Sequence, residues 1–305
     1  MLGQELVRTF TAGDCEVIAW DRENIDVTNE QLLREKILQL WPDVIMNATA
    51  YNAVDLCEEN EEEYEKAHIL NAIVPGILAD VANDLRAVLV HYSTDYVFDG
   101  ERPEYRGEGK APGCCGSGCK GCSYFRPDGI FDGYREHDLP NPLSRYGRTK
   151  YEGELAVEKG TDQHYIIRLS KLFGLPAEAE GAKRSFFDVM AEKGRQEKSV
   201  SVVDGEMSCF TYAPDLALQT RSLIEEENPF GIYHVVNADP VTWYSAVKHL
   251  FELLNISCEV QAVDSSAFPR PAKRPEKSVL INTKRENLRT WKEALKEYIE
   301  ESSLK

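Results

Sequence analysis

The chain has 305 residues, of which 42% are hydrophobic and 29% are charged, and its formal net charge is −17. This composition is typical of a soluble globular protein with one large or two smaller domains. Because no basic stripe offsets the acidic charge, we expect no nucleic-acid partner. No stretch is apolar for long enough to span a bilayer, and no basic-then-apolar leader opens the chain. We therefore expect no membrane partner and a cytoplasmic location.

Hydrophobic patterns predict strands and helices that alternate along the chain. The predicted strands cover residues 16–20, 44–50, 87–92, 165–169, 200–203 and 232–236. The first predicted helix follows a capping box of Thr28 and Gln31, the second covers residues 64–81, and the third starts near residue 146. The other predicted helices cover residues 186–192, 215–224, 243–254 and 285–299. The strands lack strict polar alternation, which favours a parallel sheet covered by helices on both faces, a doubly wound α/β fold.

Two predicted strands end in short segments that contain polar side chains, Asn47–Tyr51 and Ser93–Tyr96. Ligands of such sheets bind at the carboxyl ends of the strands. Small side chains at Ala48 and Ala50 would let a cofactor approach the backbone, although tight helix–strand packing explains them equally well.

Tyr146 and Lys150 are four residues apart near the start of a predicted helix, just after a loop rich in proline and asparagine. Side chains at this spacing share a helix face, and a nearby ammonium lowers a tyrosine pKa that is normally ~10. This arrangement indicates a proton donor, and a hydroxyl of Ser93 or Thr94 would hold the same substrate oxygen. Together these groups are typical of carbonyl reduction with a nicotinamide cofactor.

The spacing alone is weak evidence, because a solvated helix face explains most such pairs. Tyr244 and Lys248 have the same separation, in a stretch that reads as an ordinary amphipathic helix. The preceding loop and the Ser93–Tyr96 segment favour Tyr146 over Tyr244.

Six stretches in chain order together resemble a known family. They are Asn24–Thr28, Asn47–Asp55, Tyr92–Gly100, Asn141–Gly147, Thr211–Ala217 and Arg274–Ser278. On these residues the chain resembles the extended short-chain dehydrogenase/reductases and, within them, the dTDP-4-dehydrorhamnose reductases. The likeness covers nearly the whole chain except residues about 101–130.

The resemblance implies reduction of the 4-keto group of a nucleotide sugar by NADPH or NADH, most specifically of dTDP-4-dehydrorhamnose to dTDP-L-rhamnose. It implies a catalytic triad of Thr94, Tyr146 and Lys150, in which Tyr146 donates the proton. The expected cofactor contacts are Gly3, Asp21, Arg22, Ala48, Ala50, Asn71, Ser93 and Lys150. The expected substrate contacts are Asn52, Asp95, Tyr96, Lys171 and Arg274. Asp21 would favour NADH and Arg22 would favour NADPH, so the choice of cofactor stays open.

The implied fold is a Rossmann-like parallel sheet with a smaller mixed α/β substrate domain. The dinucleotide-binding domain would cover residues 1–170, together with about 205–228, and residues 171–305 would mainly bind substrate. The likeness starts only at the last glycine of the dinucleotide fingerprint, Gly3, so we expect the sheet to lack its first strand. An incomplete chain and a genuine loss of this strand both explain this start.

A segment of about residues 101–133 interrupts the resemblance and contains four of the eight cysteines. These are Cys114, Cys115, Cys119 and Cys122. Their spacing favours a metal site, and four thiolates would suit zinc or an iron–sulfur centre. Redox thiols, disulfides and an insert without fixed structure are the alternatives.

Two other functions remain open at this stage. The first is a non-catalytic regulatory subunit of the same fold, like the β subunit of methionine adenosyltransferase. Lys171, which stands where the family usually has an aromatic residue, favours this alternative, whereas Thr94, Tyr146 and Lys150 oppose it. The second is a metal- or redox-responsive switch controlled by the cysteine segment. A homodimer also remains open.

Overall fold

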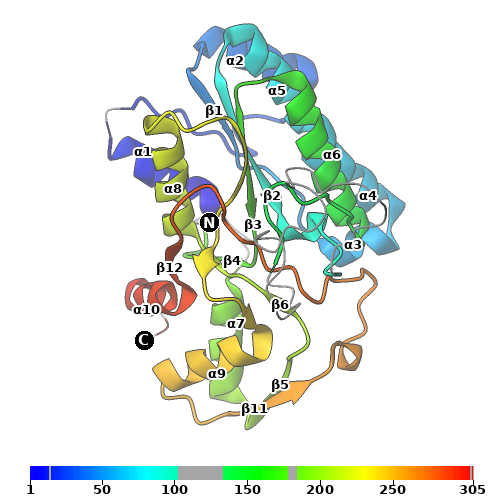
Figure 1. Cartoon of the computed structure of the whole chain (residues 1–305), viewed down its shortest axis with the longest axis vertical. Coiled ribbons are helices and arrows are strands. Elements are labelled where there is room, and N and C mark those ends of the chain that lie inside the picture. The colour runs from blue at the N-terminus through cyan, green and yellow to red at the C-terminus, as the bar shows by residue number, and fades with distance from the viewer. Residues whose placement is uncertain (14, 102–132, 178–183, 303, 305) are drawn as a thin grey trace, which may run out of the picture.

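The computed structural model describes residues 1–13, 15–101, 133–177, 184–302 and 304 (Figure 1). Its α-helices are α1 Leu2–Thr11, α2 Glu30–Leu40, α3 Val54–Glu59, α4 Glu61–His68, α5 Val74–Leu85, α6 Arg145–Gly160, α7 Phe186–Gln196, α8 Ala213–Glu225, α9 Trp243–Leu253 and α10 Trp291–Glu301. Its strands are β1 Val44–Asn47, β2 Val88–Thr94, β3 His164–Leu169, β4 Leu172–Phe173, β5 Ser199–Val203, β6 Met207–Ser208, β7 Thr211–Tyr212, β8 Gly231–His234, β9 Asn237–Ala238, β10 Val241–Thr242, β11 Glu259–Val263 and β12 Leu288–Thr290. A π-helical turn, η1 Ile69–Ile73, joins α4 to α5, and two 3₁₀ turns are η2 Asp95–Val97 and η3 Ser265–Ala267.

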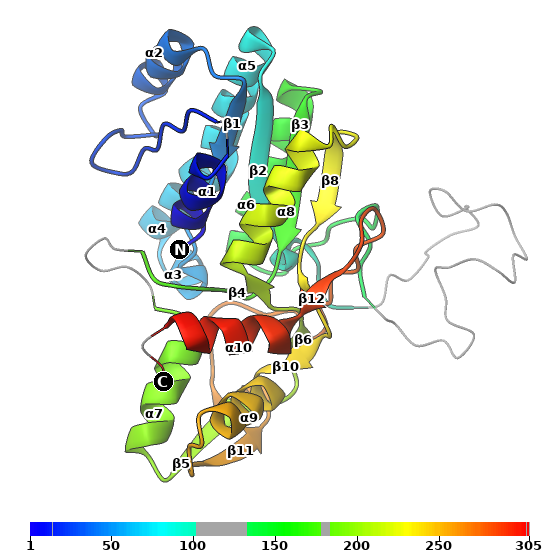
Figure 2. The same cartoon turned by 90° about the vertical axis from the view of Figure 1, so that its left-hand side faces the viewer.

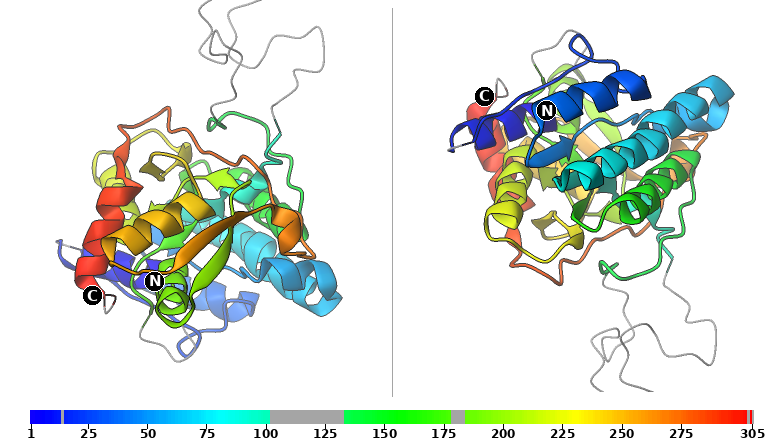
Figure 3. Two further views of the ribbon diagram at one scale, coloured as in Figure 1. Left: turned by 90° about the horizontal axis from the view of Figure 1, so that it is seen from below. Right: turned by 90° about the horizontal axis from the view of Figure 1, so that it is seen from above.

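A parallel sheet with the strand order β1-β2-β3-β8 forms the centre of the larger lobe, at the top of Figure 1. Helices α5 and α6 cover one face of this sheet and α1 and α8 cover the other (Figures 2 and 3). Buried aliphatic side chains fill both interfaces, with Leu89 and Ile166 on the α5 side and Val90 and Ile167 on the α8 side. The predicted doubly wound α/β fold is confirmed.

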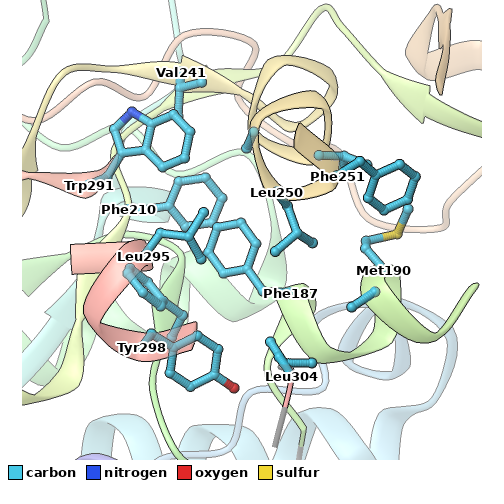
Figure 4. Close-up of a cluster of buried hydrophobic side chains, with 14 of the residues drawn as sticks. Phe187, Met190, Phe210, Val241, Leu250, Phe251, Trp291, Leu295, Tyr298 and Leu304 are labelled. Carbon is cyan, nitrogen blue, oxygen red and sulfur yellow. The ribbon is translucent and has the colours of Figure 1, made fainter. Parts of the chain in front are cut away.

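The smaller lobe has its own core, which Figure 4 shows. Helices α7, α9 and α10 surround a cluster of buried aromatic and aliphatic side chains that includes Phe187, Phe210, Leu250, Trp291 and Leu295. The parallel pair β5 and β11 packs against α9. Because these side chains belong to residues 173–304, this lobe contains much of the predicted substrate domain. The exact division of the chain into domains stays a prediction.

The predicted strand at residues 16–20 is wrong, because this segment has no regular secondary structure. A strand needs a hydrogen-bonded neighbour, and within the described ranges none pairs with this segment. The next predicted strand in the chain, β1, pairs with β2 alone among the described strands and forms one edge of the sheet. The segment is apolar enough for a strand, but its neighbourhood gives it no partner.

Two predicted helix starts also differ from the structure. Asn29, and not Thr28, caps α2, because the Thr28 hydroxyl donates instead to the Asp26 carboxylate at 2.7 Å. The last helix begins at Trp291, since Thr290 and Glu293 form a reciprocal capping box there. None of the helices in the described residues is long and apolar enough to cross a membrane.

Candidate active site

Helix α6 carries Tyr146 and Lys150 against the carboxyl end of β2. Ser144 caps the helix by accepting a hydrogen bond from the Gly147 backbone N–H at 3.1 Å. A Cβ atom at Gly147 would overlap the carbonyl oxygen of Tyr96, so glycine lets this first turn lie directly against η2. The approach buries both Tyr146 and Lys150, which are 9% and 2% exposed.

Thr94 is the last residue of β2, so its hydroxyl stands at the strand end that meets α6 through η2. The same hydroxyl accepts from the Tyr96 backbone N–H at 3.2 Å and donates to the Asp95 carboxylate at 3.1 Å. The Tyr96 ring packs edge-on against Tyr146, with 6.0 Å between the ring centroids. The predicted strand end and the predicted helix start thus meet in one cluster of polar groups.

The predicted lowered pKa of Tyr146 is wrong as a net effect. Burial raises the pKa of Tyr146 above its usual value, although the hydrogen bond with Thr94 opposes this. The Lys150 Nζ donates to the Tyr92 carbonyl oxygen at 2.6 Å, so the ammonium points to the backbone of β2. Burial lowers the pKa of Lys150 to about 8, against the opposing charge of Glu154.

Asn71 lies in the π-helical turn η1 and is fully buried. Its amide accepts from the Tyr51 N–H at 2.9 Å and donates to the Tyr51 carbonyl oxygen at 3.0 Å and to the Thr149 hydroxyl at 3.1 Å. A Cβ atom at Gly153 would collide with the Asn71 carbonyl oxygen, so glycine is required where α6 crosses η1. Asn71 therefore joins three segments of the site, and its predicted cofactor contact stays a prediction.

The other predicted cofactor residues are mostly exposed. Ala48 and Ala50 follow β1 as solvent-exposed small residues, and a Cβ atom at Gly3 would meet open space. Asp21 and Arg22 are exposed as well, and Asp21 accepts from the backbone N–H groups of its own turn, at 2.9 Å and 3.2 Å. This open surface beside a strand end fits a dinucleotide.

Ser93 supplies a second observation that fits a bound cofactor. Its side chain is 3% exposed, and its hydroxyl has no hydrogen-bond partner within the described part of the chain. Buried polar groups are normally satisfied, so an unpaired hydroxyl next to Thr94 suits a ligand that binds at this strand end.

A cavity of about 960 Å³ lies between the two lobes. Three predicted substrate residues line it, namely Asn52, Tyr96 and Arg274. Asp95 and Lys171 are absent from its lining, whereas the aromatic residues Phe186 and Trp243, which the sequence analysis did not predict, line it. Tyr146 is not among the residues that line the cavity, but its ring packs against one of them, Tyr96.

Two arginines of the cavity pair with carboxylates. Arg274 binds Asp55 through both of its terminal nitrogens, one of them 2.7 Å from Oδ2. Arg270 pairs with Glu206, whose carboxylate also accepts from the Trp243 indole N–H at 3.2 Å. Asp55 lies in one of the stretches that carry the resemblance, but nothing in the sequence indicated that a residue 219 positions away would pair with it.

Lys171 follows β3 and lies beside the cavity without lining it. Its Nζ is 4.0 Å from the Trp243 ring centroid and donates to the Val241 carbonyl oxygen at 3.4 Å. Burial lowers the pKa of Lys171 to about 8, opposed by the charges of Asp95 and Glu206. The predicted contact of this lysine with substrate stays a prediction.

The predicted metal ligands Cys114, Cys115, Cys119 and Cys122 lie outside the described residues. The structure describes four other cysteines, and all four are free thiols. They are Cys15, Cys57, Cys209 and Cys258. Among the described residues, no group of histidine, cysteine and carboxylate side chains is arranged to hold a metal ion.

The family model described as the RmlD substrate binding domain matches residues 1–304 of the chain. The chain belongs to this family. The predicted resemblance to the dTDP-4-dehydrorhamnose reductases is therefore confirmed for this RmlD-family protein.

Curated relatives agree with this assignment. A probable dTDP-4,6-dihydroxy-2-methyloxan-3-one 4-ketoreductase of Streptomyces antibioticus is 32% identical, over 97% of this chain and 90% of the relative. The dTDP-4-dehydrorhamnose reductase of Salmonella typhimurium is 31% identical, over 85% of this chain and 78% of the relative.

Solved structures resemble the RmlD-family protein along almost its whole length. A dTDP-4-dehydrorhamnose reductase from Clostridium acetobutylicum is 33% identical, with a TM-score of 0.82 over 98% of this chain and 95% of that one. The dTDP-4-dehydrorhamnose reductase of Bacillus anthracis, solved in complex with NADP, is 26% identical, with a TM-score of 0.83 over 99% of this chain and 95% of that one.

Proposed function

We propose that the protein reduces the 4-keto group of a dTDP-linked sugar with NADPH, and that dTDP-4-dehydrorhamnose is its substrate. The observation that carries this proposal is the close packing of the start of α6, with buried Tyr146 and Lys150, against the end of β2 that holds Thr94. A phenol at this strand end can donate to a ketone oxygen bound there, and family membership supplies the class of reaction.

Each catalytic residue has a distinct task in this proposal. The phenol of Tyr146 donates its proton to the ketone oxygen as that oxygen gains negative charge. Thr94 accepts a hydrogen bond from the phenol in this proposal, and its hydroxyl marks the position of the ketone oxygen. Lys150 contributes a buried positive charge one helical turn away, which stabilises the phenolate that remains.

The raised pKa of Tyr146 agrees with a proton donor. Burial keeps the phenol protonated at neutral pH, so the proton is available before the reaction starts. The positive charge of Lys150 matters after the transfer, when the phenolate forms in a buried place.

NADPH supplies the hydride when it is bound. The residues that would hold it are those beside the open strand ends, Ala48, Ala50 and Ser93, together with Lys150 and the start of α1. The cavity residues Asn52, Tyr96 and Arg274 would hold the nucleotide sugar. Arg274 carries the positive charge that would pair with a diphosphate, and Asp55 orients the Arg274 guanidinium.

Deuterium transfer tests the proposal against a purely regulatory role. The purified chain is incubated with dTDP-4-dehydrorhamnose and NADPH that carries deuterium at both positions of C4 of the nicotinamide, and the sugar product is analysed by mass spectrometry. We expect one deuterium in the sugar. Binding of both ligands with no reduced sugar would instead support the regulatory-subunit alternative.

A further inference from the structure

Asp95 is buried beside the catalytic threonine and makes three hydrogen bonds through its carboxylate. Its Oδ1 accepts from the Thr94 hydroxyl at 3.1 Å. Its Oδ2 accepts from the Ser170 hydroxyl at 2.8 Å and from the Ser278 hydroxyl at 2.5 Å. The side chain is 3% exposed and does not line the cavity, so the predicted direct contact with substrate has no support in this geometry.

The hydrogen bonds of Thr94 have a defined direction. A hydroxyl has one proton and two acceptor lone pairs. The proton of Thr94 points to Asp95, and one lone pair accepts from the Tyr96 backbone N–H. The other lone pair remains open to the phenol of Tyr146 as a donor. A chain of donors can thus run from Tyr146 through Thr94 to Asp95.

We propose that Asp95 is a positioning residue, which acts through Thr94 to hold the proton of Tyr146 at the place where the ketone oxygen binds. Asp95 does so as the acceptor at the end of this chain of hydrogen bonds. The inference rests on the proposed function, since the effect on turnover requires a reductase.

The two donors on Oδ2 come from distant parts of the chain. Ser170 follows β3 in the larger lobe, whereas Ser278 lies in the segment that crosses from the smaller lobe. They fix the carboxylate from the side opposite Thr94. Asp95 thereby ties the catalytic end of β2 to the segment that also carries Arg274 into the cavity.

A double-mutant cycle tests whether Asp95 acts through Thr94. Asp95→Ala should lower kcat by about 100-fold, because a displacement of about 1 Å in a reacting group has an effect of this size. NADPH binding and KM should change little. In the Thr94→Val background, which has no hydroxyl to position, the same change should lower kcat by no more than about twofold. Equal losses in both backgrounds would overturn the proposal.

Three further variants complete the design. Asp95→Asn keeps an acceptor at Oδ1 and should restore most of kcat. Ser278→Ala removes one donor from Oδ2, leaves the contact with Thr94 intact, and should change kcat only slightly. Asp95→Ser is too short to reach Thr94 but keeps a polar group in the buried site, so it replaces Asp95→Ala if that variant does not fold.

A titration gives a readout that does not depend on turnover. Without Asp95, the Thr94 proton is free to stabilise the Tyr146 phenolate, and a negative charge next to the phenol is lost. The absorbance titration of tyrosinate should then show one tyrosine with a lower pKa, and Tyr146→Phe should remove this component. No shift would overturn the inference even for a protein without reductase activity, whereas a wild-type protein without deuterium transfer would overturn only the proposed function.

Discussion

The catalytic side and the cofactor side of the larger lobe differ in how completely the chain builds them. On the catalytic side, Thr94, Tyr146 and Lys150 are buried, and Thr94 and Lys150 have hydrogen-bond partners. On the cofactor side, Ala48 and Ala50 are exposed beside β1, which forms an edge of the sheet. If the proposed roles hold, the protein itself fixes the geometry of proton transfer, whereas the cofactor would meet a surface of small and exposed residues.

A buried ion pair supports the catalytic side. Glu154, one turn after Lys150 on α6, binds Arg168 of β3 through both carboxylate oxygens, at 2.9 Å and 2.6 Å. Both side chains are almost fully buried, and the guanidinium lies 5.1 Å from the Phe98 ring centroid. This pair connects α6, the helix that carries Tyr146, to the sheet.

The largest predicted effect comes from breaking this pair. Glu154→Gln leaves the Arg168 charge buried without a counter-charge, which should lower the free energy of unfolding by about 3–5 kcal/mol. Urea unfolding followed by circular dichroism measures the change. Glu61→Gln is the matched control, since Glu61 pairs with Arg145 on the surface, and it should change the unfolding midpoint little. Similar losses in both variants would mean that the catalytic side is no more tightly built than the surface.

The pH dependence of turnover sharpens the comparison. Burial lowers the pKa of Lys150 to about 8, so the lysine is a cation below this pH and becomes neutral above it. Turnover should therefore fall as the pH rises through about 8, by up to about tenfold for each further pH unit.

Lys171 is the control for this assignment, because burial also lowers its pKa to about 8. The fall in turnover should persist in Lys171→Met, which removes the second lysine that titrates in this range. Loss of the fall in that variant would assign the titration to Lys171 and contradict the role of Lys150.

The smallest predicted effect lies on the cofactor side. Arg22 is exposed, so its contact with the 2′-phosphate of NADPH would be screened by solvent. Arg22→Ala should weaken NADPH binding by no more than about fivefold and leave NADH binding unchanged. Titration of the fluorescence of each reduced cofactor measures this. Equal weakening of both cofactors would show that Arg22 does not distinguish them.

Features that depend on a local sequence pattern could be predicted from the sequence. The strand end at Thr94 and the helix start at Tyr146 depend on local patterns, and the structure has both where they were expected. The segment at residues 16–20 has the pattern of a strand, but a strand also depends on a neighbour, which a local pattern does not report.

Contacts between residues far apart in the chain were the other feature that the sequence could not predict. The pairs Asp55 with Arg274 and Asp95 with Ser278 join residues that are 219 and 183 positions apart. A single sequence shows the residue types but not which of them meet. The prediction of a lowered pKa for Tyr146 failed for a related reason, because the burial of this side chain depends on how α6 packs against η2.

The central claim is that Tyr146 donates the proton in ketone reduction, and a pair of phenylalanine variants tests it most directly. Tyr244 has the same spacing to a lysine, Lys248, whose Nζ lies 5.5 Å from the Tyr244 ring centroid on α9. Tyr146→Phe should lower kcat by about 10²- to 10⁴-fold with NADPH binding intact, and Tyr244→Phe should leave kcat unchanged. Unchanged turnover in Tyr146→Phe, or an equal loss in Tyr244→Phe, would contradict the account.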